Sequence, residues 1–476
     1  MKRFLTIGWT VLTLAAAFAA GAQERNMARL TLADTAYVDV SMGLRGEAGP
    51  MKDIFAPEQL VQGVLDVVSQ RRLDKVSLYG HFGYGYDYGK GSTWRGWIDP
   101  YETPFMAADS VPGALSLERY SLQAGAGLPL GGGWAAGLDL DYDVALMAKH
   151  KDLRSKNTAM TFRIAPGVSW KGESLGLGLD AGYERSTERV EFTQISENVE
   201  HTLFDIYGVW LCHGNGYASA ETRRFKEAER FYGDFQLDVR LGSAELHNNI
   251  RADFRREAQT EVGYNNLRHG DVRSLTWSDD LSLQIGRRHL VQVTAAFSTM
   301  QGFRPLQQQE LDPDSRIRIW VTYGDPVFCY YRRTHREQFD YTYQSAQDWE
   351  LALGVENEGM MHAYTEYPRR FAQQFSSVTP YLGGKIPVGR AGSLTARIGY
   401  AHSYGTENNV SEWQLAEPLL EQWDYWDGDS VLAGIAAAWR KDRMYVQARY
   451  DIVISASAAD NDGTRQVAGL TVGFIF

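Results

Sequence analysis

The chain has 476 residues, with 48 Lys and Arg against 59 Asp and Glu, a formal net charge of -11, 47 Gly, 26 Tyr and 2 Cys. A negative net charge argues against binding to nucleic acid, because phosphate backbones need a basic face. No stretch after residue 22 reaches the roughly 18 apolar residues of a membrane helix, which excludes a helical membrane protein. Two cysteines cannot hold a disulfide-rich scaffold, and no Cys/His cluster has zinc spacing, so we expect neither a metal nor a cofactor. The abundant Gly and Tyr favour a large β-structure.

The first 22 residues are typical of a secretory signal. Lys2 and Arg3 precede an apolar run at 4–20, and residues 20–22 (Ala-Gly-Ala) form a small-residue cleavage site before Gln23. A membrane anchor fits less well because the run is short and ends in small residues. No Cys stands at the cleavage point, which excludes a lipoprotein. We therefore expect export; in a cell with two membranes the destination is the periplasm, the outer membrane or the medium.

The C-terminal residues 469–476 (GLTVGFIF) favour the outer membrane. Apolar side chains alternate with Gly and Thr, which is the period of a β-strand, and the chain ends on Phe476. Such a strand resembles the closing strand of bacterial outer-membrane β-barrels, where a final Phe is the usual assembly signal. The resemblance implies that the barrel-assembly machinery recognises Phe476.

The same alternation recurs along the chain, at residues 138–146, 175–184, 234–241, 250–255 and 444–452. In a membrane barrel the apolar faces meet lipid and the charged faces line the interior. The predicted strands have about 9–14 residues, longer than the usual 5–6 of soluble sheets. We therefore predict an all-β fold, a transmembrane antiparallel β-barrel in contact with outer-membrane lipid.

Turn chemistry predicts the number of strands. Short links lie at 129–133, 171–174, 242–245, 286–289, 387–392 and 440–443, with a less clear one at 356–360. Longer polar segments separate them, at about 89–114, 147–158, 187–230, 256–278, 302–342, 405–428 and 456–463, with a weakly marked one near 366–376. Seven short turns predict 16 strands, or 14 if the turn at 356–360 is wrong. The short turns should lie on the periplasmic side of the membrane and the long loops on the outer side.

Residues 23–74 do not follow this repeat. Residues 35–42 are consistent with a short strand, and 56–73 reads as a helix with a stripe of Leu and Val. Such a segment would plug the lumen, cap the periplasmic mouth or lie loosely against the rim. The predicted organisation is a signal peptide at 1–22, an N-terminal segment at 23–74 and a barrel at 75–476.

Charged side chains on the predicted inner faces are the candidate lumen-lining residues. They are Asp139, Asp141, Asp143, Arg163, Asp180, Glu184, Asp238, Arg240, Arg251, Asp253, Arg255, Arg397, Arg449 and Asp451. Charges of both signs can select solutes in a pore. A salt-bridged interior that only keeps the barrel rigid explains the same residues, so both interpretations stay open.

The loop at 405–428 contains the candidate outer binding residues Trp413, Trp423, Tyr425 and Trp426 among several acids. Clustered aromatics can stack on a sugar, hold a planar ligand or dock a partner. A large loop that packs on itself is the other interpretation.

The two cysteines, Cys212 and Cys329, fall in predicted outer loops. Export to an oxidising compartment permits a disulfide between them. Free thiols fit the sequence as well.

The sequence offers little support for an enzyme activity. His213, His335, His362 and His402 lie near predicted outer regions, but none has a Ser or carboxylate at a spacing that demands pairing. The HExxH motif is absent. We therefore expect no catalytic residues and no enzyme activity.

The aromatic segment at 79–97 (YGHFGYGYDYGKGSTWRGW), together with the signal, the N-terminal segment and the terminal GLTVGFIF, resembles an uncharacterised outer-membrane β-barrel family of the Bacteroidota. The resemblance covers nearly the whole mature chain, but its motifs are diffuse and carry over no functional residue. Some members of that family are encoded beside TonB-dependent receptors and iron-related proteins. This implies a link to nutrient or iron uptake, with a TonB-dependent receptor or a surface lipoprotein as partner.

The leading hypothesis is a porin-like or substrate-selective barrel for small solutes in the outer membrane of a Gram-negative cell. The alternative is a non-conducting barrel that serves as a scaffold for a surface uptake complex. A barrel hydrolase is the third.

Overall fold

The computed structural model describes residues 26–32, 36–195, 201–208, 211–217, 222–261, 267–365, 370–410, 417–456 and 463–476. The signal sequence predicted at 1–22 lies outside these residues. No helix among them is long and apolar enough to cross a membrane.

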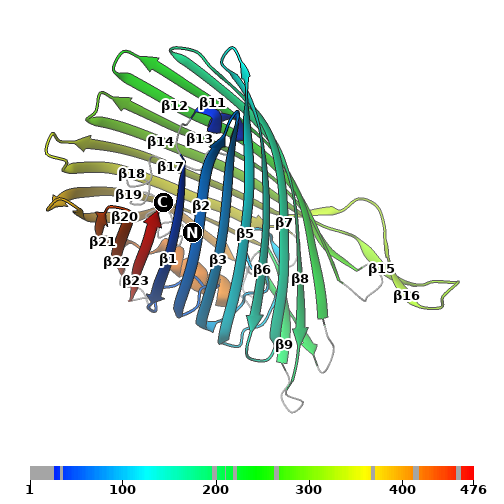
Figure 1. Ribbon diagram of the computed structural model, residues 1–476. Helices are drawn as coiled ribbons and strands as arrows, with labels where there is room; N and C mark the ends of the chain where they lie inside the picture. Colours follow the sequence, from blue (N-terminus) through cyan, green and yellow to red (C-terminus); the bar gives the residue numbers. More distant parts are fainter. Residues whose placement is uncertain are drawn as a thin grey trace.

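The fold is a closed antiparallel barrel of 18 strands (Figure 1). The strands are β1 (Tyr37–Ala48), β2 (Gln59–Leu73), β3 (Val76–Ser92), β5 (Gly113–Gly131), β6 (Trp134–Lys149), β7 (Arg154–Lys171), β8 (Leu175–Thr193), β11 (Thr222–Leu241), β12 (Ala244–Glu261), β13 (Arg268–Ile285), β14 (His289–Arg304), β17 (Val327–Gln344), β18 (Glu350–Tyr364), β19 (Phe371–Val388), β20 (Gly392–Val410), β21 (Ser430–Lys441), β22 (Met444–Ser455) and β23 (Thr464–Ile475). β23 pairs with β1 from Ile475 opposite Asp39 to Gln466 opposite Ala48. This last pairing leaves no free sheet edge, as a lipid-embedded sheet requires.

Short turns join the strands at one edge of the barrel, which also holds Tyr37 and Phe476. The turns are residues 74–75, 132–133, 172–174, 242–243, 286–288, 345–349, 389–391 and 442–443. Phe476 is paired there with Val38 through two backbone hydrogen bonds of 2.8 and 3.2 Å. The other edge carries longer connections, and the combination resembles outer-membrane barrel proteins.

The predicted count of 16 strands is wrong, and the difference arises in the N-terminal segment. The predicted helix at 56–73 is strand β2, and the short strand expected at 35–42 is part of β1. Both pair along their full lengths, so the barrel begins at Tyr37 and the predicted domain boundary near residue 74 is an ordinary short turn. A short apolar run fits a helix and a strand equally well, and here sheet pairing decides the outcome.

One of the seven predicted short turns is also wrong. β18 runs straight through 356–360, and the turn lies at 345–349 instead. The six other predicted turns are confirmed.

Along each strand, side chains point alternately outward from the barrel and inward to the lumen. Outward residues include exposed Leu179, Phe231, Phe339 and Leu470, whereas inward positions carry most of the charges, as the sequence predicts. In β2 this alternation splits the supposed helical stripe between the two faces.

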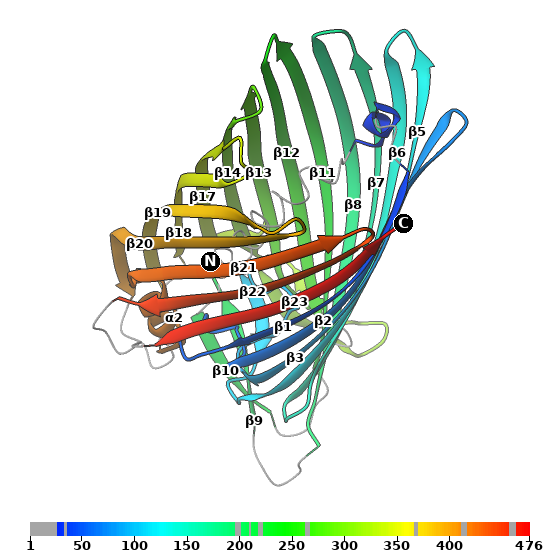
Figure 2. The same ribbon diagram turned by 60° about the vertical axis from the view of Figure 1, so that its left-hand side comes forward.

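Several connections of the long edge fold back between the barrel walls (Figure 2). They contain the strands β4 (Phe105–Ala108), β9 (His201–Tyr207) and β10 (Leu211–Tyr217) and the helix α2 (Glu417–Asp427). β9 pairs with β4 on one side and with β10 on the other. In contrast, β15 (Gln307–Leu311) and β16 (Arg318–Thr322) form a separate hairpin that projects away from the barrel (Figure 1).

Candidate functional site

A cavity of about 710 Å³ occupies the lumen beside β1, β2, β13, β14 and β17–β23. Its charged lining residues are Arg45, Arg287, Arg288, Lys385, Arg397, Arg449, Asp66, Asp340, Glu350 and Asp451. Arg287 and Arg288 belong to the short turn at 286–288, so the cavity reaches the short-turn edge. Small residues, among them Gly383, Gly469 and Ala436, keep the space open.

The charges in this cavity are ordered by neighbours on the wall. Arg449 donates to Asp451 at 2.5 and 3.0 Å, and Lys385 lies 2.9 Å from Glu350. The guanidinium of Arg397 lies over the ring of Tyr381, 3.4 Å from its centroid. Fixed charges of both signs on a water-accessible surface can orient and select a polar solute.

Of the predicted lumen residues, Arg397, Arg449 and Asp451 line this cavity. The opposite wall holds the others on inward faces, where most of them are packed, although the side chains of Arg240 and Asp238 near the short-turn edge are 64% and 37% exposed. The carboxylate of Asp139 is fully buried and lies 2.6 Å from Arg163, which also pairs with Asp141 and donates to Tyr232 at 2.8 Å. For this part of the wall the geometry fits the interpretation as a rigidifying salt-bridge network.

The remaining predicted charges belong to similar contacts. Ser121 donates to Asp143, Gln236 donates to Asp180, Glu184 pairs with Arg230, Arg251 and Arg230 pair with Asp253, Asp238 pairs with Arg29 and His247, and Arg240 pairs with Glu245 across the short turn at 242–243. None of these residues lines the 710 Å³ cavity.

The N-terminal 3₁₀ helix η1 (Met27–Leu32) fills the lumen next to this packed wall. Inward glycines on β5–β8 make room for it: a Cβ on Gly137 would lie 2.1 Å from the nitrogen of Ala28, and one on Gly127 would lie 2.3 Å from the oxygen of Met27. Asn26 donates to the oxygen of Val168 at 3.0 Å. The glycines therefore shape a cradle for the N-terminal segment.

At the long-loop end, an apolar cluster bridges the lumen. Its members from the walls are Val190, Phe192, Val272, Met300, Tyr330, Tyr364 and Phe371, and those from the inward-folded connections include Ile54, Phe55, Trp97, Phe105, Met106, Leu203 and Ile206. A buried polar contact joins three connections: Tyr101 donates to Asp53, and Gln422 donates to Asp53 at 3.2 Å. These loops stand between the cavity and the outside.

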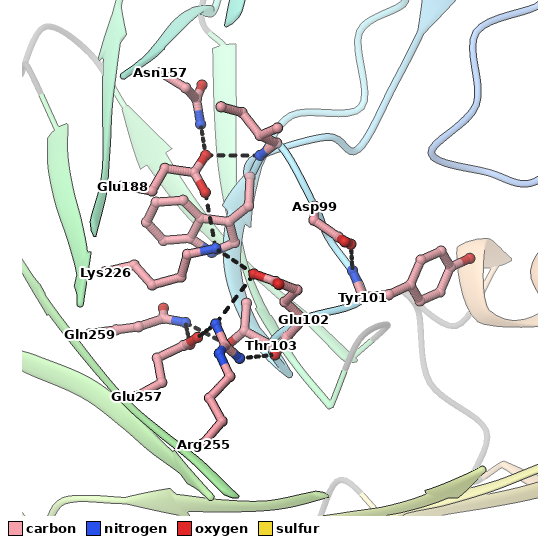
Figure 3. A network of polar contacts seen from close by, with 12 residues as sticks. Asp99, Tyr101, Glu102, Thr103, Asn157, Glu188, Lys226, Arg255, Glu257 and Gln259 are labelled. Carbon is pink, nitrogen blue, oxygen red and sulfur yellow. Dashed lines mark hydrogen bonds and ion pairs between the residues drawn. The ribbon is translucent and has the colours of Figure 1, made fainter. Parts of the chain in front are cut away.

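A network of charges fixes the connection at 93–112 to the barrel wall (Figure 3). The carboxylate of Glu102 lies 3.2 Å from Arg255, 3.7 Å from Lys226 and 4.0 Å from Arg230. The guanidinium of Arg255 also donates to the backbone oxygen of Glu102 at 3.0 Å. We name these four residues the Glu102 latch.

The latch is stable in its charged form. The Glu102 side chain is 37% exposed, yet the protein surrounds it closely enough that loss of solvation opposes its ionisation. The cations of Arg255, Lys226 and Arg230 outweigh this effect and lower the pKa of Glu102 to about 2. At neutral pH the ionised carboxylate therefore holds the connection in the lumen.

Neighbouring side chains complete the network. Glu188 lies 2.9 Å from Lys226 and accepts hydrogen bonds of 2.8 Å from Asn157 and from the backbone of Ile98. Gln259 donates to Thr103 at 2.6 Å. Arg255 was predicted as a pore-lining residue, but it serves here to position a loop; the sequence holds no signal for Glu102, because its partners are far away along the chain.

The aromatic residues of the loop at 405–428 that the structure describes do not form an exposed platform. Trp423, Tyr425 and Trp426 are buried and pack with Met51, Met360 and Phe375. Trp413 lies outside the described residues. The packing interpretation fits these contacts better than ligand capture.

The thiol of Cys329 is buried and lies 3.6 Å from the oxygen of Gly302. The side chain of Cys212 lies outside the described part of the chain. A disulfide between them stays a prediction.

The three rim histidines whose side chains the structure describes do not come together. His362 is buried on the inner face of β18 and lies 3.0 Å from Gln373, whereas His402 lies 3.1 Å from Asp429 on the outer face of β20. His335 lies on the outer face of β17, and the side chain of His213 is outside the described residues. Among the described residues, no group of three or more His, Cys, Asp or Glu could hold a metal ion.

Residues 27–476 match a protein family described as a family of unknown function (DUF6850). The chain belongs to this family. The expected membership of an uncharacterised family is thus confirmed, whereas the bacterial group stays a prediction. No curated protein matches this DUF6850 chain.

Solved structures similar to this DUF6850 protein include the ferric-catecholate import receptor Fiu from E. coli K12, with 10% identity, coverage of 93% and 82% of the two chains and a TM-score of 0.41. The copper transporter OprC has 8% identity, coverage of 93% and 80% and a TM-score of 0.43. A FadL homologue from Pseudomonas aeruginosa has 10% identity, coverage of 95% and 93% and a TM-score of 0.34. At these values the likeness carries no argument about ligands or partners of this chain.

Proposed function

We propose that this protein is an outer-membrane β-barrel that passes small solutes through its lumen, as a pore or a substrate-selective transporter. The cavity of about 710 Å³, lined by charges of both signs in a closed barrel with an apolar outer face, is the observation that carries the proposal. The inward-folded loops and the Glu102 latch represent its closed state. Passage then requires these loops to move.

Conductance of the refolded protein in a planar bilayer tests this proposal. We expect little conductance from the wild type and a severalfold, steady rise from Glu102→Gln, because the neutral amide no longer pairs with Arg255 and Lys226. Glu310→Gln, at an exposed residue of the projecting hairpin, is the matched control and should conduct like the wild type. If all three proteins are folded and silent, and remain silent after residues 26–32 are deleted, the transport proposal fails.

A non-conducting scaffold is the second candidate, and the apolar cluster that bridges the lumen favours it. In that role the fixed loops present a surface to a neighbouring TonB-dependent receptor or surface lipoprotein. This agrees with the link to nutrient or iron uptake that the family resemblance implies. Silent but folded protein in the bilayer experiment would support it.

We further propose that residues 26–32 act as a short lumen plug after removal of a signal at 1–22, and that Phe476 guides barrel assembly. The seat of η1 on the glycine cradle supports the first point. The backbone pairing of Phe476 with Val38, beside the closing strand pair, supports the second. We also propose no enzymatic role, because the described rim histidines His335, His362 and His402 do not come together.

A further inference from the structure

The outward face of the barrel carries two carboxylates where lipid is expected. Asp279 on β13, Ala295 on β14, Glu337 on β17 and Asn357 on β18 are directly paired across four neighbouring strands. They face outward because Gln284, Gln292, Asp340 and Ala352, which line the lumen cavity, stand on the opposite faces of the same strands. We call these four residues the polar row.

The polar row lies at mid-height of the apolar band. Asp279 is six residues from the short-turn end of β13 at Ile285, which is roughly 14 Å along the membrane normal for a strand tilted by about 45°. The apolar band of such barrels is about 25 Å tall. Above the row come Leu275 and Phe297, exposed by 55% and 44%, and Arg273 follows near the upper border.

The carboxylates are ordered by neighbours on the same face. Asn248 donates to Asp279 at 2.5 Å, and Asn357 donates to Glu337 at 2.8 Å. The hydroxyl of Tyr404 donates to Asn357 at 2.7 Å. The amide donors orient the acids but do not neutralise them, and the residue that stands between the acids on β14 is the small Ala295.

We propose that the polar row docks the membrane-spanning part of a different outer-membrane protein that presents an Arg or Lys side chain over Ala295. Ionisable groups on the lipid side of a membrane protein are unfavourable unless they are paired, and a cation between two carboxylates pairs both. A second copy of this chain fits less well. On the two strands that carry the acids, the outward arginines Arg273 and Arg333 lie nearer the long-loop edge, so twofold contact would bring acids together at one height.

Site-specific cross-linking in native outer membranes tests the proposal. A photoreactive residue replaces Ala295, and in a matched control it replaces Leu179, which faces outward on β8. We expect a protein adduct from position 295 and none from position 179. The cross-linked peptide should lie in a membrane-spanning segment with an Arg or Lys close by.

The carboxylates are then removed from the cross-linking protein. Asp279→Asn with Glu337→Gln keeps their shape and should lower the adduct roughly tenfold, the loss expected from one or two charged hydrogen bonds. Asp279→Lys should abolish the adduct, and an Asp in place of the partner's cation should restore it. The amount of folded barrel in the membrane serves as the reference.

Three results overturn the proposal: lipid adducts alone at position 295, an adduct with the mass of two copies, or an adduct that persists in the amide double variant. If the amide variant does not fold, the charge swap alone decides, and failure to rescue is then the contrary result. The outcome is independent of whether the lumen conducts.

Discussion

The two sides of the lumen use similar residues for different ends. On β5–β12, charges are packed against each other and against the N-terminal segment, as with the fully buried Asp139 beside Arg163. On β17–β23 and β1, charges such as Lys385 border an open cavity. The comparison shows that an inward charge borders the open cavity only where no internal segment covers it.

The glycines should give the largest difference between the two sides. Gly137→Ala places a Cβ 2.1 Å from the nitrogen of Ala28, so we expect the N-terminal segment to lose its packing against β5–β8. Gly469→Ala is the matched control, because its Cβ would meet nothing closer than the oxygen of Leu44 at 3.7 Å. Hydrogen exchange at residues 26–32 measures the effect, and equal protection in both variants would contradict the cradle.

Ion pairs should separate the two sides next. Arg163→Gln leaves buried carboxylates without their cation and should lower the free energy of unfolding by ~3–5 kcal/mol. Urea unfolding of the barrel in detergent checks this value. A loss below ~1 kcal/mol would show that Asp139 and Asp141 do not depend on Arg163.

Acid should release the Glu102 latch. The pKa of Glu102 is lowered from 4.5 to about 2 in the folded protein, so its ionised form stabilises the closed loop above about 4.5, and that stabilisation is lost as pH falls towards 2. We expect conductance to rise across this interval. Glu102→Gln should lack this rise in conductance. Glu188 and Glu257 are present in both proteins, so a conductance change that arises from them appears in both.

The smallest effect is expected on the open wall. Lys385 is 30% exposed and lies 2.9 Å from Glu350, so Lys385→Gln should change the free energy of unfolding by about 0–1 kcal/mol. In a Glu102→Gln background, however, it should shift the reversal potential towards cations. Changed stability with unchanged selectivity would place Lys385 with the packed wall.

The sequence predicts the barrel well because each strand carries its own alternation and each short turn its own turn residues. Six turns and the closing strand at 469–476 follow from such local signals. The segment at 59–73 misleads because its Val and Leu residues satisfy two periods. The turn at 345–349 contains no Gly or Pro, whereas Gly359 draws the predicted turn to 356–360, inside β18.

The site is predicted less completely, since its elements are separated by long stretches of chain. Arg397, Arg449 and Asp451 are recognisable from alternation, but Glu102 becomes a latch only because its loop returns between strands that carry Lys226 and Arg255. Likewise, nothing near Trp426 in sequence indicates that it packs against Phe375.

By itself the sequence determines a β-barrel chain with apolar outward faces and charged inward faces, because alternation of side chains is a local property of a strand. The tertiary structure decides that there are 18 strands, which inward charges meet water and which loops close the lumen. These features depend on which strands pair and on where loops and the N-terminal segment come to rest, and distant parts of the chain settle both together.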